Sequence, residues 1–356
     1  MRLLYLIRHG QPLLPGDGHV CLGVTDAPLS PLGRLQACLL GEALGDRART
    51  VFSSPLSRAL ETARFLKPEP IVLPGLREYS TGDWDGLPFS EIRARWPEVY
   101  AARGEDPTVP IPNAEDYGAG QRRFHAAVRE ALAGSEGDIA VVAHAGVMGA
   151  LLSGLFGSRA YDGHEYRPPY CGWYVLAAEG DALTARLPFE TAGSELTDAL
   201  CRRLLRAVPL PEHILAHCEA VAAEAVLIAE ALNATGLSLD VPLIRRSALL
   251  HDLARLENNH AETGARWLEA LGYGAEAEIV RRHHDPDTDA LNEANVVYLA
   301  DKCVQGAELV PLRERFETSK QKCRDSEALA AHERRRQQAL RLAAAVNTQC
   351  DQEVIR

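Results

Sequence analysis

The chain has 356 residues, which is too long for one ordinary domain and about right for two. Hydrophobic residues make up 46% of it and charged residues 24%, the balance of a globular protein with apolar mass for two cores. The 38 lysines and arginines are outnumbered by 49 acids, and the net charge of -11 disfavours nucleic-acid polymers and anionic membranes as partners.

The cysteines and the apolar segments indicate in which cellular compartment the protein lies. The eight cysteines form no C-x-x-C pair, which disfavours a zinc ribbon, a redox motif or a disulfide framework. The amino terminus reaches Arg8 and His9 too early for a signal peptide, and the apolar run 139–156 is short for a membrane span and contains His144. These features predict a cytoplasmic protein without a membrane partner, and they leave oligomer formation open.

Short apolar runs alternate with helical stretches through the first half of the chain. The pattern predicts strands at 3–7, 50–52, 70–73, 139–143 and 173–178, and helices at 30–44, 57–65, 90–103 and 117–133. The stretch 104–113, rich in proline and acid, is predicted to be a loop. Such alternation is typical of an α/β fold of three layers, with a mostly parallel sheet covered by helices.

The pattern changes after about residue 188, and from residue 194 almost every segment has helical periodicity. Helices are predicted at 211–232, 241–256, 260–271, 275–283, 292–304 and 337–354, with a charged stretch, 313–336, before the last one. No strand is predicted here. We therefore expect an α/β domain at 1–190, an all-α domain at 195–322 and a C-terminal helical extension at 323–356.

Polar residues follow four of the predicted strands at their carboxyl ends. Arg8 and His9 follow the first, a Ser-Ser-Pro segment with Arg58 follows the second, Glu78 follows the third, and His144 follows the fourth. Ligands of open α/β sheets bind beyond the carboxyl ends of the strands. We therefore expect these five side chains to meet at one edge of the sheet.

The chemistry of these residue types fits phosphoryl transfer. A neutral imidazole can attack phosphorus and hold the phosphoryl group covalently, which predicts His9 as the nucleophile. Arg8, Arg58 and His144 can bind the phosphate oxygens, and Glu78 can protonate the leaving alcohol and then deprotonate the attacking water. Each residue alone also fits a structural role, such as a surface pair or a buried core histidine, but the four segments together favour a catalytic site.

The four segments also resemble a known family. The Arg-His-Gly start, Ser-Ser-Pro-x-x-Arg-Ala, Glu-x-x-x-Gly-x-Trp-x-Gly and Ala-His-Ala-Gly occur in the order of the histidine phosphatase superfamily, also called phosphoglycerate-mutase-like, over about the first 190 residues. Segment 22–30 is more similar to α-ribazole phosphatases and broad small-molecule phosphatases than to mutases. The resemblance implies a phosphoglycerate-mutase-like fold and a phosphatase site that uses no metal.

A second group of polar residues ends apolar helical runs in the second half. His217 lies beside an apolar stripe, the doublet His251-Asp252 ends the run 248–250, and Asp301 ends the run 296–300. Burying two imidazoles and two carboxylates without a partner is costly. A divalent metal held by side chains from facing helices would supply that partner, so the sequence predicts a metal site at these four residues.

These four residues resemble the ordered His, His-Asp and Asp ligands of the HD superfamily of metal-dependent phosphohydrolases, from about residue 210 to 306. The resemblance implies that Asp252 can bridge two ions and that His260, His283 and His284 are further ligands, although His-rich turns also occur as solvated loops. Segment 284–287 reads His-Asp-Pro-Asp where the HD-GYP branch has Gly-Tyr-Pro, which disfavours that branch. Segment 298–302, Tyr-Leu-Ala-Asp-Lys, is more similar to bacterial HD hydrolases acting on nucleotides or dinucleoside polyphosphates. Manganese, iron, zinc, magnesium and nickel fit this ligand set alike.

The two predicted sites together indicate a bifunctional phosphohydrolase of small phosphorylated metabolites, with nucleotides as the favoured class. One alternative is a phosphatase whose HD domain is a regulatory nucleotide-binding module. A phosphoglycerate-type mutase is disfavoured by the short region 25–28. A non-enzymatic scaffold leaves the converging polar residues unexplained.

Overall fold

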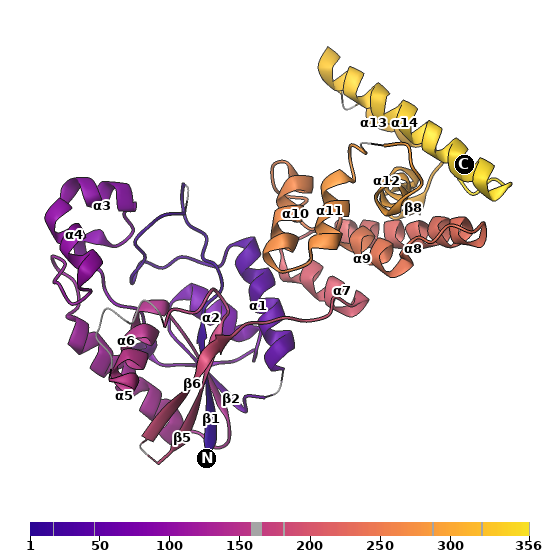
Figure 1. Ribbon diagram of the computed structural model, residues 1–356. Coiled ribbons are helices and arrows are strands. Elements are labelled where there is room, and N and C mark those ends of the chain that lie inside the picture. The colour runs from indigo at the N-terminus through magenta and orange to yellow at the C-terminus, as the bar shows by residue number, and fades with distance from the viewer. Residues whose placement is uncertain are drawn as a thin grey trace. The chain divides into compact units, whose positions relative to one another are not determined.

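The computed structural model describes residues 1–16, 18–45, 47–157, 166–180, 182–286, 288–321 and 323–355. Backbone contacts divide the chain into two compact units, Met1–Ser194 and Glu195–Arg356 (Figure 1). Within the described ranges, none of the helices combines the length and the apolar character needed to cross a membrane.

The first unit is built on a six-stranded sheet with the order β3-β2-β4-β1-β5-β6. Its strands are β1 (Arg2–Arg8), β2 (Thr50–Ser53), β3 (Ile71–Val72), β4 (Ile139–Ala143), β5 (Trp173–Glu179) and β6 (Ala182–Glu190). The pairings β1–β4, β4–β2 and β2–β3 are parallel, whereas β5 and β6 join antiparallel beside β1. The predicted α/β class is confirmed, with a mixed sheet.

Helices cover both faces of this sheet (Figure 1). Because side chains alternate along a strand, Leu4 and Leu6 pack on one side and Tyr5 and Ile7 on the other. The first pair faces the core shared with α5 and α6, and the second pair faces the core shared with α1 and α2. These helices are α1 (Pro31–Leu44), α2 (Ser57–Arg64), α5 (Tyr117–Ala133) and α6 (Ala145–Phe156).

Two elements of the first unit were not predicted from the sequence. Strand β6 lies at the edge of the sheet beside β5 and contains Pro188, and its sequence lacks the apolar run of the central strands. Helix α6 is buried over most of its length and apolar on nearly all sides, so it has no polar face that would reveal a helical period.

The predicted helix 90–103 is wrong in one respect, because it is two helices, α3 (Phe89–Arg95) and α4 (Pro97–Glu105). The break lies at Trp96, whose φ of -133° and ψ of 59° are not helical. A residue that precedes proline is sterically disfavoured in the helical region, which explains the break before Pro97. A small apolar cluster supports this region; it contains Cys21, Trp84, Ile92 and Ile111. Two 3-10 turns precede it, η1 (Pro74–Leu76) and η2 (Gly82–Trp84).

The second unit is helical, as predicted. Its helices are α7 (Asp198–Ala207), α8 (Glu212–Ala234), α9 (Val241–Leu250), α10 (His260–Ala270), α11 (Gly274–Arg282), α12 (Glu293–Cys303), α13 (Leu312–Lys320) and α14 (Ser326–Cys350). Side chains on α8, α9 and α12 are the most deeply buried and form its centre.

Several details of the second unit differ from the prediction. A two-stranded hairpin, β7 (Val304–Gln305) and β8 (Glu308–Leu309), follows α12 where no strand was predicted. Helix α9 ends at Leu250 and is followed by turns to residue 256, which places His251 and Asp252 at a helix end. Most of the charged stretch 313–336 is helical, because α13 and the first part of α14 lie within it. Asp325 caps α14 by accepting a hydrogen bond from the backbone N–H of Ala328 at 2.7 Å.

Candidate active site and candidate metal centre

The first group of polar residues, which we call the first site, consists of Arg8, His9, Arg58, Glu78 and His144. The structure brings all five together beyond the carboxyl ends of β1, β2 and β4. The His9 and His144 rings lie with their centroids 5.0 Å apart, and Arg58 Nε donates to His9 Nε2 at 3.3 Å. Except for the fully buried His144, these residues line a cavity of about 580 Å³.

The His9 ring is held in one tautomer. Its Nδ1 lies 2.7 Å from the carbonyl oxygen of Gly10, which can only accept, so Nδ1 carries the proton and Nε2 keeps its lone pair. Burial, followed by the positive charge of Arg58 and then Arg8, holds the pKa of His9 well below its usual value. At neutral pH the residue is therefore a neutral imidazole, and its Nε2 lone pair accepts the hydrogen bond from Arg58 Nε.

Arg58 is held in place by backbone carbonyls of the loop 23–25, and Asp85 holds that loop through hydrogen bonds. Its Nη1 and Nη2 donate to the carbonyl oxygens of Thr25 and Gly23, at 3.0 and 2.7 Å. The Asp85 carboxylate in turn accepts from the backbone N–H groups of Gly23, Val24 and Thr25, at 2.8, 2.9 and 2.9 Å. Asp85 was not predicted as a site residue, although it lies inside the Glu-x-x-x-Gly-x-Trp-x-Gly segment.

Glu78 lies at the amino-terminal end of α6. Its two carboxylate oxygens accept from the N–H groups of Gly146 and Val147, at 2.8 and 3.0 Å, and from Tyr79 N at 2.9 Å. The positive end of the helix therefore holds the carboxylate in place. A Cβ at Gly146 would lie 2.6 Å from Glu78 Oε1, so this approach requires glycine.

Arg8 and His144 each make one hydrogen bond to the protein and keep a further side-chain nitrogen that could bind a ligand. Arg8 Nη1 donates to the carbonyl oxygen of Pro168 at 2.9 Å, and the guanidinium lies 4.0 Å from the centroid of the Tyr170 ring. His144 Nε2 lies 2.7 Å from Ser54 Oγ. Arg8 Nε and His144 Nδ1 are buried and find no hydrogen-bond partner in the described part of the chain. Tyr170 was missed from the sequence because it lies in an irregular segment without a motif.

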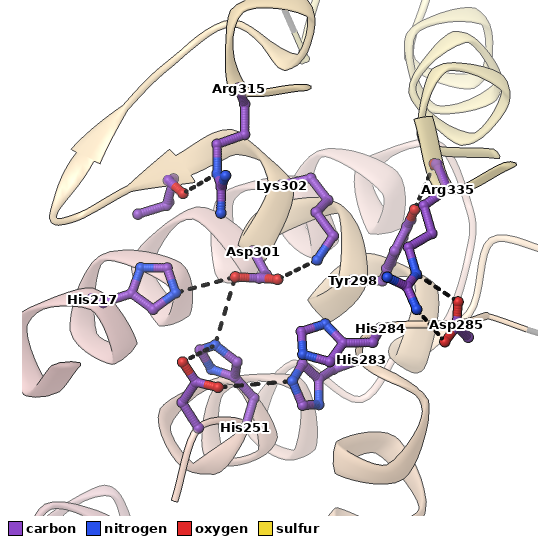
Figure 2. Close-up of polar contacts among 12 residues, drawn as sticks. His217, His251, His283, His284, Asp285, Tyr298, Asp301, Lys302, Arg315 and Arg335 are labelled. Atoms are coloured by element: carbon purple, nitrogen blue, oxygen red, sulfur yellow. Dashed lines mark hydrogen bonds and ion pairs between the residues drawn. The ribbon is translucent and has the colours of Figure 1, made fainter. Parts of the chain in front are cut away.

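The second group of polar residues meets between α8, α12 and the turn after α9 (Figure 2). His217 comes from α8 and Asp301 from α12, and His217 Nε2 lies 3.1 Å from Asp301 Oδ1. His251 Nε2 lies 3.7 Å from the same oxygen. One ligand atom each from His217, His251 and Asp252 lies within 4.8 Å of the others.

A second trio adjoins the first through Asp252. Ligand atoms of His260, His283 and His284 lie within 4.8 Å of one another. Asp252 Oδ1 lies 3.3 Å from His260 Nε2 and 3.9 Å from His283 Nε2, while its other oxygen lies 3.7 Å from His251 Nε2. The structure thus gathers all seven residues into one group, which we call the seven-residue cluster.

The bonding in this cluster fits a divalent metal. In three of its histidines Nδ1 lies within hydrogen-bond distance of a backbone carbonyl, which leaves Nε2 as the ligand atom. These bonds join His217 to Gly306 at 2.9 Å, His251 to Ala248 at 2.7 Å and His283 to Val280 at 2.6 Å. Among the described residues, no hydrogen-bond partner exists for the buried atoms His251 Nε2, His283 Nε2 and Asp252 Oδ1. A shared cation would satisfy these atoms.

The protonation states agree with metal binding. Burial raises the pKa of Asp301, but Lys302 and His217 outweigh this effect and hold that pKa well below its usual value. Burial, with the charge of His251, lowers the pKa of His283 to about 3. The carboxylate is therefore ionised and the imidazole neutral at neutral pH, as metal coordination requires.

Two cations beside the cluster were not singled out from the sequence. Lys302 Nζ donates to Asp301 Oδ2 at 2.5 Å, which leaves Oδ1 toward the histidines (Figure 2). Arg255 Nη1 lies 3.2 Å from His260 Nε2, and Arg255 Nε lies 3.7 Å from Asp252 Oδ2. Lysine and arginine in helical sequences usually face solvent, so only the coordinates reveal this placement.

Helix α14 connects the segments that carry the ligands. Arg335 makes a two-pronged ion pair with Asp285, the residue after His284, at 2.8 and 2.9 Å. The Tyr298 hydroxyl, one helical turn before Asp301 on α12, donates to the backbone carbonyl of Arg335 at 2.8 Å (Figure 2). Asp287, also part of the sequence comparison with the HD-GYP branch, lies outside the described residues.

Comparison with known proteins finds a matching family for each of the two units. The model of the histidine phosphatase superfamily (branch 1) matches residues 4–191, and that of the HD domain matches residues 214–305. A glucosyl-3-phosphoglycerate phosphatase of Mycolicibacterium vanbaalenii is 31% identical over 54% of this chain and 86% of the relative. A metal-independent phosphoserine phosphatase of Arabidopsis thaliana is 34% identical over 28% of this chain and 44% of the relative.

Solved structures give a similar list of neighbours. The α-ribazole phosphatase of Shigella flexneri is 29% identical, with a TM-score of 0.47 over 55% of this chain and 100% of that one. Relatives of the first unit are thus named phosphatases, and both matched families are hydrolases of phosphate esters. Since the first match spans more than half of its length, the chain belongs to the histidine phosphatase superfamily, carries an HD domain behind that region, and is a hydrolase acting on phosphate esters.

Proposed function

We propose that the chain is a bifunctional phosphohydrolase of small phosphorylated metabolites. Residues 1–190 would act without a metal through a phosphohistidine at His9, and residues 195–322 would act with bound divalent metal on nucleotides, supported by the helical extension 323–356. The observation that carries the first half is the neutral His9 ring, which keeps its lone pair on Nε2 and lines a cavity together with Arg8 and Arg58.

In the first step His9 Nε2 attacks phosphorus. A P–N bond forms while the P–O bond to the leaving group breaks, and the leaving oxygen takes a proton from Glu78. Arg8, Arg58 and His144 bind the remaining phosphate oxygens as negative charge develops on them. Glu78 enters this step as the carboxylic acid, positioned by the backbone N–H groups of Gly146 and Val147.

In the second step water attacks the phosphohistidine. Glu78, now a carboxylate, accepts a proton from the water as the new P–O bond forms and the P–N bond breaks. The electron pair of the broken bond returns to His9 Nε2, which restores the neutral ring beside Arg58. Inorganic phosphate then leaves the cavity.

In the second domain the proposed ligands are the members of the seven-residue cluster: His217, His251, Asp252, His260, His283, His284 and Asp301. A bound divalent metal would supply a Lewis acid and lower the pKa of a bound water. Backbone carbonyls orient His217, His251 and His283 through Nδ1, and Lys302 holds the second oxygen of Asp301. Manganese, iron, zinc, magnesium and nickel fit these donors alike.

Chelation separates the two proposed activities. We expect EDTA to leave hydrolysis of an aryl phosphate in place and to remove hydrolysis of nucleotides that depends on added manganese. Acid-labile, base-stable labelling by a ³²P-phosphomonoester should appear in the wild type and be absent in His9→Gln. Loss of all turnover with EDTA would contradict a metal-free first site, and transfer of phosphate to an added alcohol in place of water would indicate a mutase.

The regulatory alternative makes a different prediction for the second domain. If the HD domain only binds a nucleotide, metal-loaded protein will show no nucleotide hydrolysis, and the added nucleotide will change the aryl phosphatase rate. Hydrolysis that persists in His9→Gln but is lost in Asp252→Asn supports catalysis by the HD domain. Equal loss in both variants contradicts two independent sites.

A further inference from the structure

The segment 168–172, which precedes β5, is tied by its backbone to the start of the first site. The backbone N–H of Arg8 donates to the carbonyl oxygen of Gly172 at 3.0 Å. In the other direction, the N–H of Cys171 donates to the carbonyl oxygens of Arg8 and His9, at 3.1 and 3.3 Å. Cys171 has a φ of 57°, in the left-handed region that side chains other than glycine rarely adopt. The segment is therefore held against the nucleophile and its neighbouring arginine.

The Tyr170 side chain lies at the site and not in a core. It is half-buried and lines the same cavity as Arg8 and His9, and its ring centroid is 5.8 Å from that of His9. The adjacent residues Cys171 and Trp173 belong to the apolar core shared with α1 and α2. Tyr170 belongs to none of the apolar clusters among the described residues. Core packing therefore does not account for an aromatic ring at this position.

The guanidinium of Arg8 is the group that the Tyr170 ring contacts most directly. Arg8 Cζ lies over the ring at 4.0 Å from its centroid, within the range of a cation–π interaction. Arg8 Nη1 donates to the carbonyl oxygen of Pro168 at 2.9 Å, so the same short segment supplies a second contact. Within the described part of the chain, no carboxylate forms an ion pair with this guanidinium. The cation is thus held by uncharged partners.

Uncharged partners suit an arginine that must bind a phosphoryl group. A carboxylate would also hold the guanidinium in place, but it would compete with the phosphate oxygens for the same donors. The face of an aromatic ring attracts the cation and takes up none of its N–H groups. Arg8 Nε, which is buried and has no hydrogen-bond partner among the described residues, therefore stays available. Donors that are oriented before the reaction need no reorganisation as charge develops.

We propose that Tyr170 is a positioning residue of the first site, whose ring holds the Arg8 guanidinium beside His9 in the orientation that binds the transferred phosphoryl group. This role rests on the proposed function of the first site. Tyr170 acts through Arg8 and not on the substrate. Its removal should therefore matter only while Arg8 is present.

Two substitutions of Tyr170 separate the ring from the hydroxyl. In full-length protein with EDTA, we expect Tyr170→Leu to lower kcat/KM for an aryl phosphate by about 5- to 30-fold, the range of a buried cation–π contact. The inhibition constant of inorganic phosphate should rise by a similar factor, because the same guanidinium binds its oxygens. Tyr170→Phe keeps the ring and should stay within about twofold of the wild type. Equal losses in the two variants would assign the effect to the hydroxyl and overturn the proposal.

A double-mutant cycle tests whether Tyr170 acts through Arg8. In the Arg8→Gln background the cation is absent, so adding Tyr170→Leu should lower kcat/KM by less than about twofold. A merely structural role predicts the same loss in both backgrounds, because loosening of the fold does not depend on the side chain of residue 8. The full loss in both backgrounds would therefore overturn the proposal.

Trp96→Leu is the matched control for the loss of a ring beside an arginine. The Trp96 ring lies 4.3 Å from the Arg95 guanidinium, is half-buried and lines no part of the cavity. We expect its kcat/KM and the inhibition constant of phosphate to stay within about twofold of the wild type. A loss as large as that of Tyr170→Leu would contradict a specific role of Tyr170. Thermal unfolding shows whether each variant is folded, and Tyr170→Met, of similar length without a ring, replaces Tyr170→Leu if that variant unfolds.

The outcomes distinguish this positioning role from the underlying activity. If His9→Gln hydrolyses the aryl phosphate as fast as the wild type, the proposed function fails and the role of Tyr170 fails with it. If hydrolysis depends on His9 but a folded Tyr170→Leu keeps the wild-type kcat/KM and inhibition constant of phosphate, only the positioning role is overturned.

Discussion

The histidines of the first site, His9 and His144, lie among arginines, whereas those of the seven-residue cluster lie beside the carboxylates of Asp252 and Asp301. His9 receives a hydrogen bond from Arg58, and the charges of Arg58 and Arg8 disfavour its protonation. His217 instead faces Asp301, which raises the pKa of His217 against the opposing effect of burial. Histidine thus lies where an anionic ligand fits in the first site and where a cationic ligand fits in the seven-residue cluster.

The buried side-chain atoms that lack a hydrogen-bond partner among the described residues differ between the two sites in the same way. In the first site they include the donor Arg8 Nε, which suits phosphate oxygens. In the seven-residue cluster they include the acceptor Asp252 Oδ1 and the Nε2 atoms of His251 and His283, which suit a cation. The sign of the missing charge therefore indicates the kind of ligand before any ligand is seen.

The largest effect that tests this difference concerns Glu78. We expect Glu78→Gln to lower kcat for an alkyl phosphate by about 10²- to 10⁴-fold and to lower it much less for p-nitrophenyl phosphate, whose leaving group needs little protonation. Steady-state rates in EDTA give both values. An equal loss with the two substrates would contradict Glu78 as the proton donor to the leaving group.

Replacing Asp252 should affect only the second domain. Asp252 lies between both trios of ligands, so we expect Asp252→Asn to weaken metal binding by about 100-fold or more, measured by elemental analysis and calorimetry. The EDTA-resistant aryl phosphatase rate should stay at the wild-type value. A fall in that rate would break the comparison, since it would show that the two sites are not independent.

Helix α14 should influence the metal without touching it. Because Arg335 holds the segment after His284 through Asp285, we expect Arg335→Gln to weaken metal binding by about tenfold. Arg341→Gln, which removes a neighbouring ion pair from the same helix to Asp289, is the control and should change affinity by less than about twofold. Equal effects of the two variants would indicate general loosening of the helix.

The smallest predicted effect is on stability. Burial, with Arg58, keeps His9 neutral in the folded protein, whereas in the unfolded chain it takes up a proton below its usual pKa of about 6.5. The unfolded state then binds more protons, so the free energy of unfolding falls as the pH falls, by about 1.4 kcal/mol between pH 7.5 and 5.5 for this residue. Urea denaturation of His9→Gln should show a decrease smaller by this amount. An unchanged slope would mean that His9 is protonated in the folded state.

Much of the fold could be predicted because local sequence determines it. Strand β4 and helix α5 begin and end where their apolar periods do, and their bounds were predicted without error. The break at Trp96 was also readable, since proline follows it, but the helical period on both sides concealed it. Strand β6 was not predictable in this way, because its pairing with β5 defines it more than its own composition does.

The candidate sites divide similarly. His9, Arg58 and His251 lie in short motifs whose spacing is visible in one dimension. Tyr170 and Arg335 have no motif, and their places beside the two sites come from neighbours distant in the chain, Arg8 for Tyr170 and Asp285 for Arg335. Residues that support a site from a distance are therefore found only once the chain is folded.

Gly146 shows how a residue without a side chain can govern the proton transfer proposed for Glu78. Even a single methyl group there would meet the Glu78 carboxylate and one of the two N–H contacts from α6 would be lost. Gly146→Ala should thus behave in kinetic assays like an exchange of the acid itself, although the altered position carries no ionisable group. An apparently conservative exchange in a helix would then separate substrates by their leaving groups.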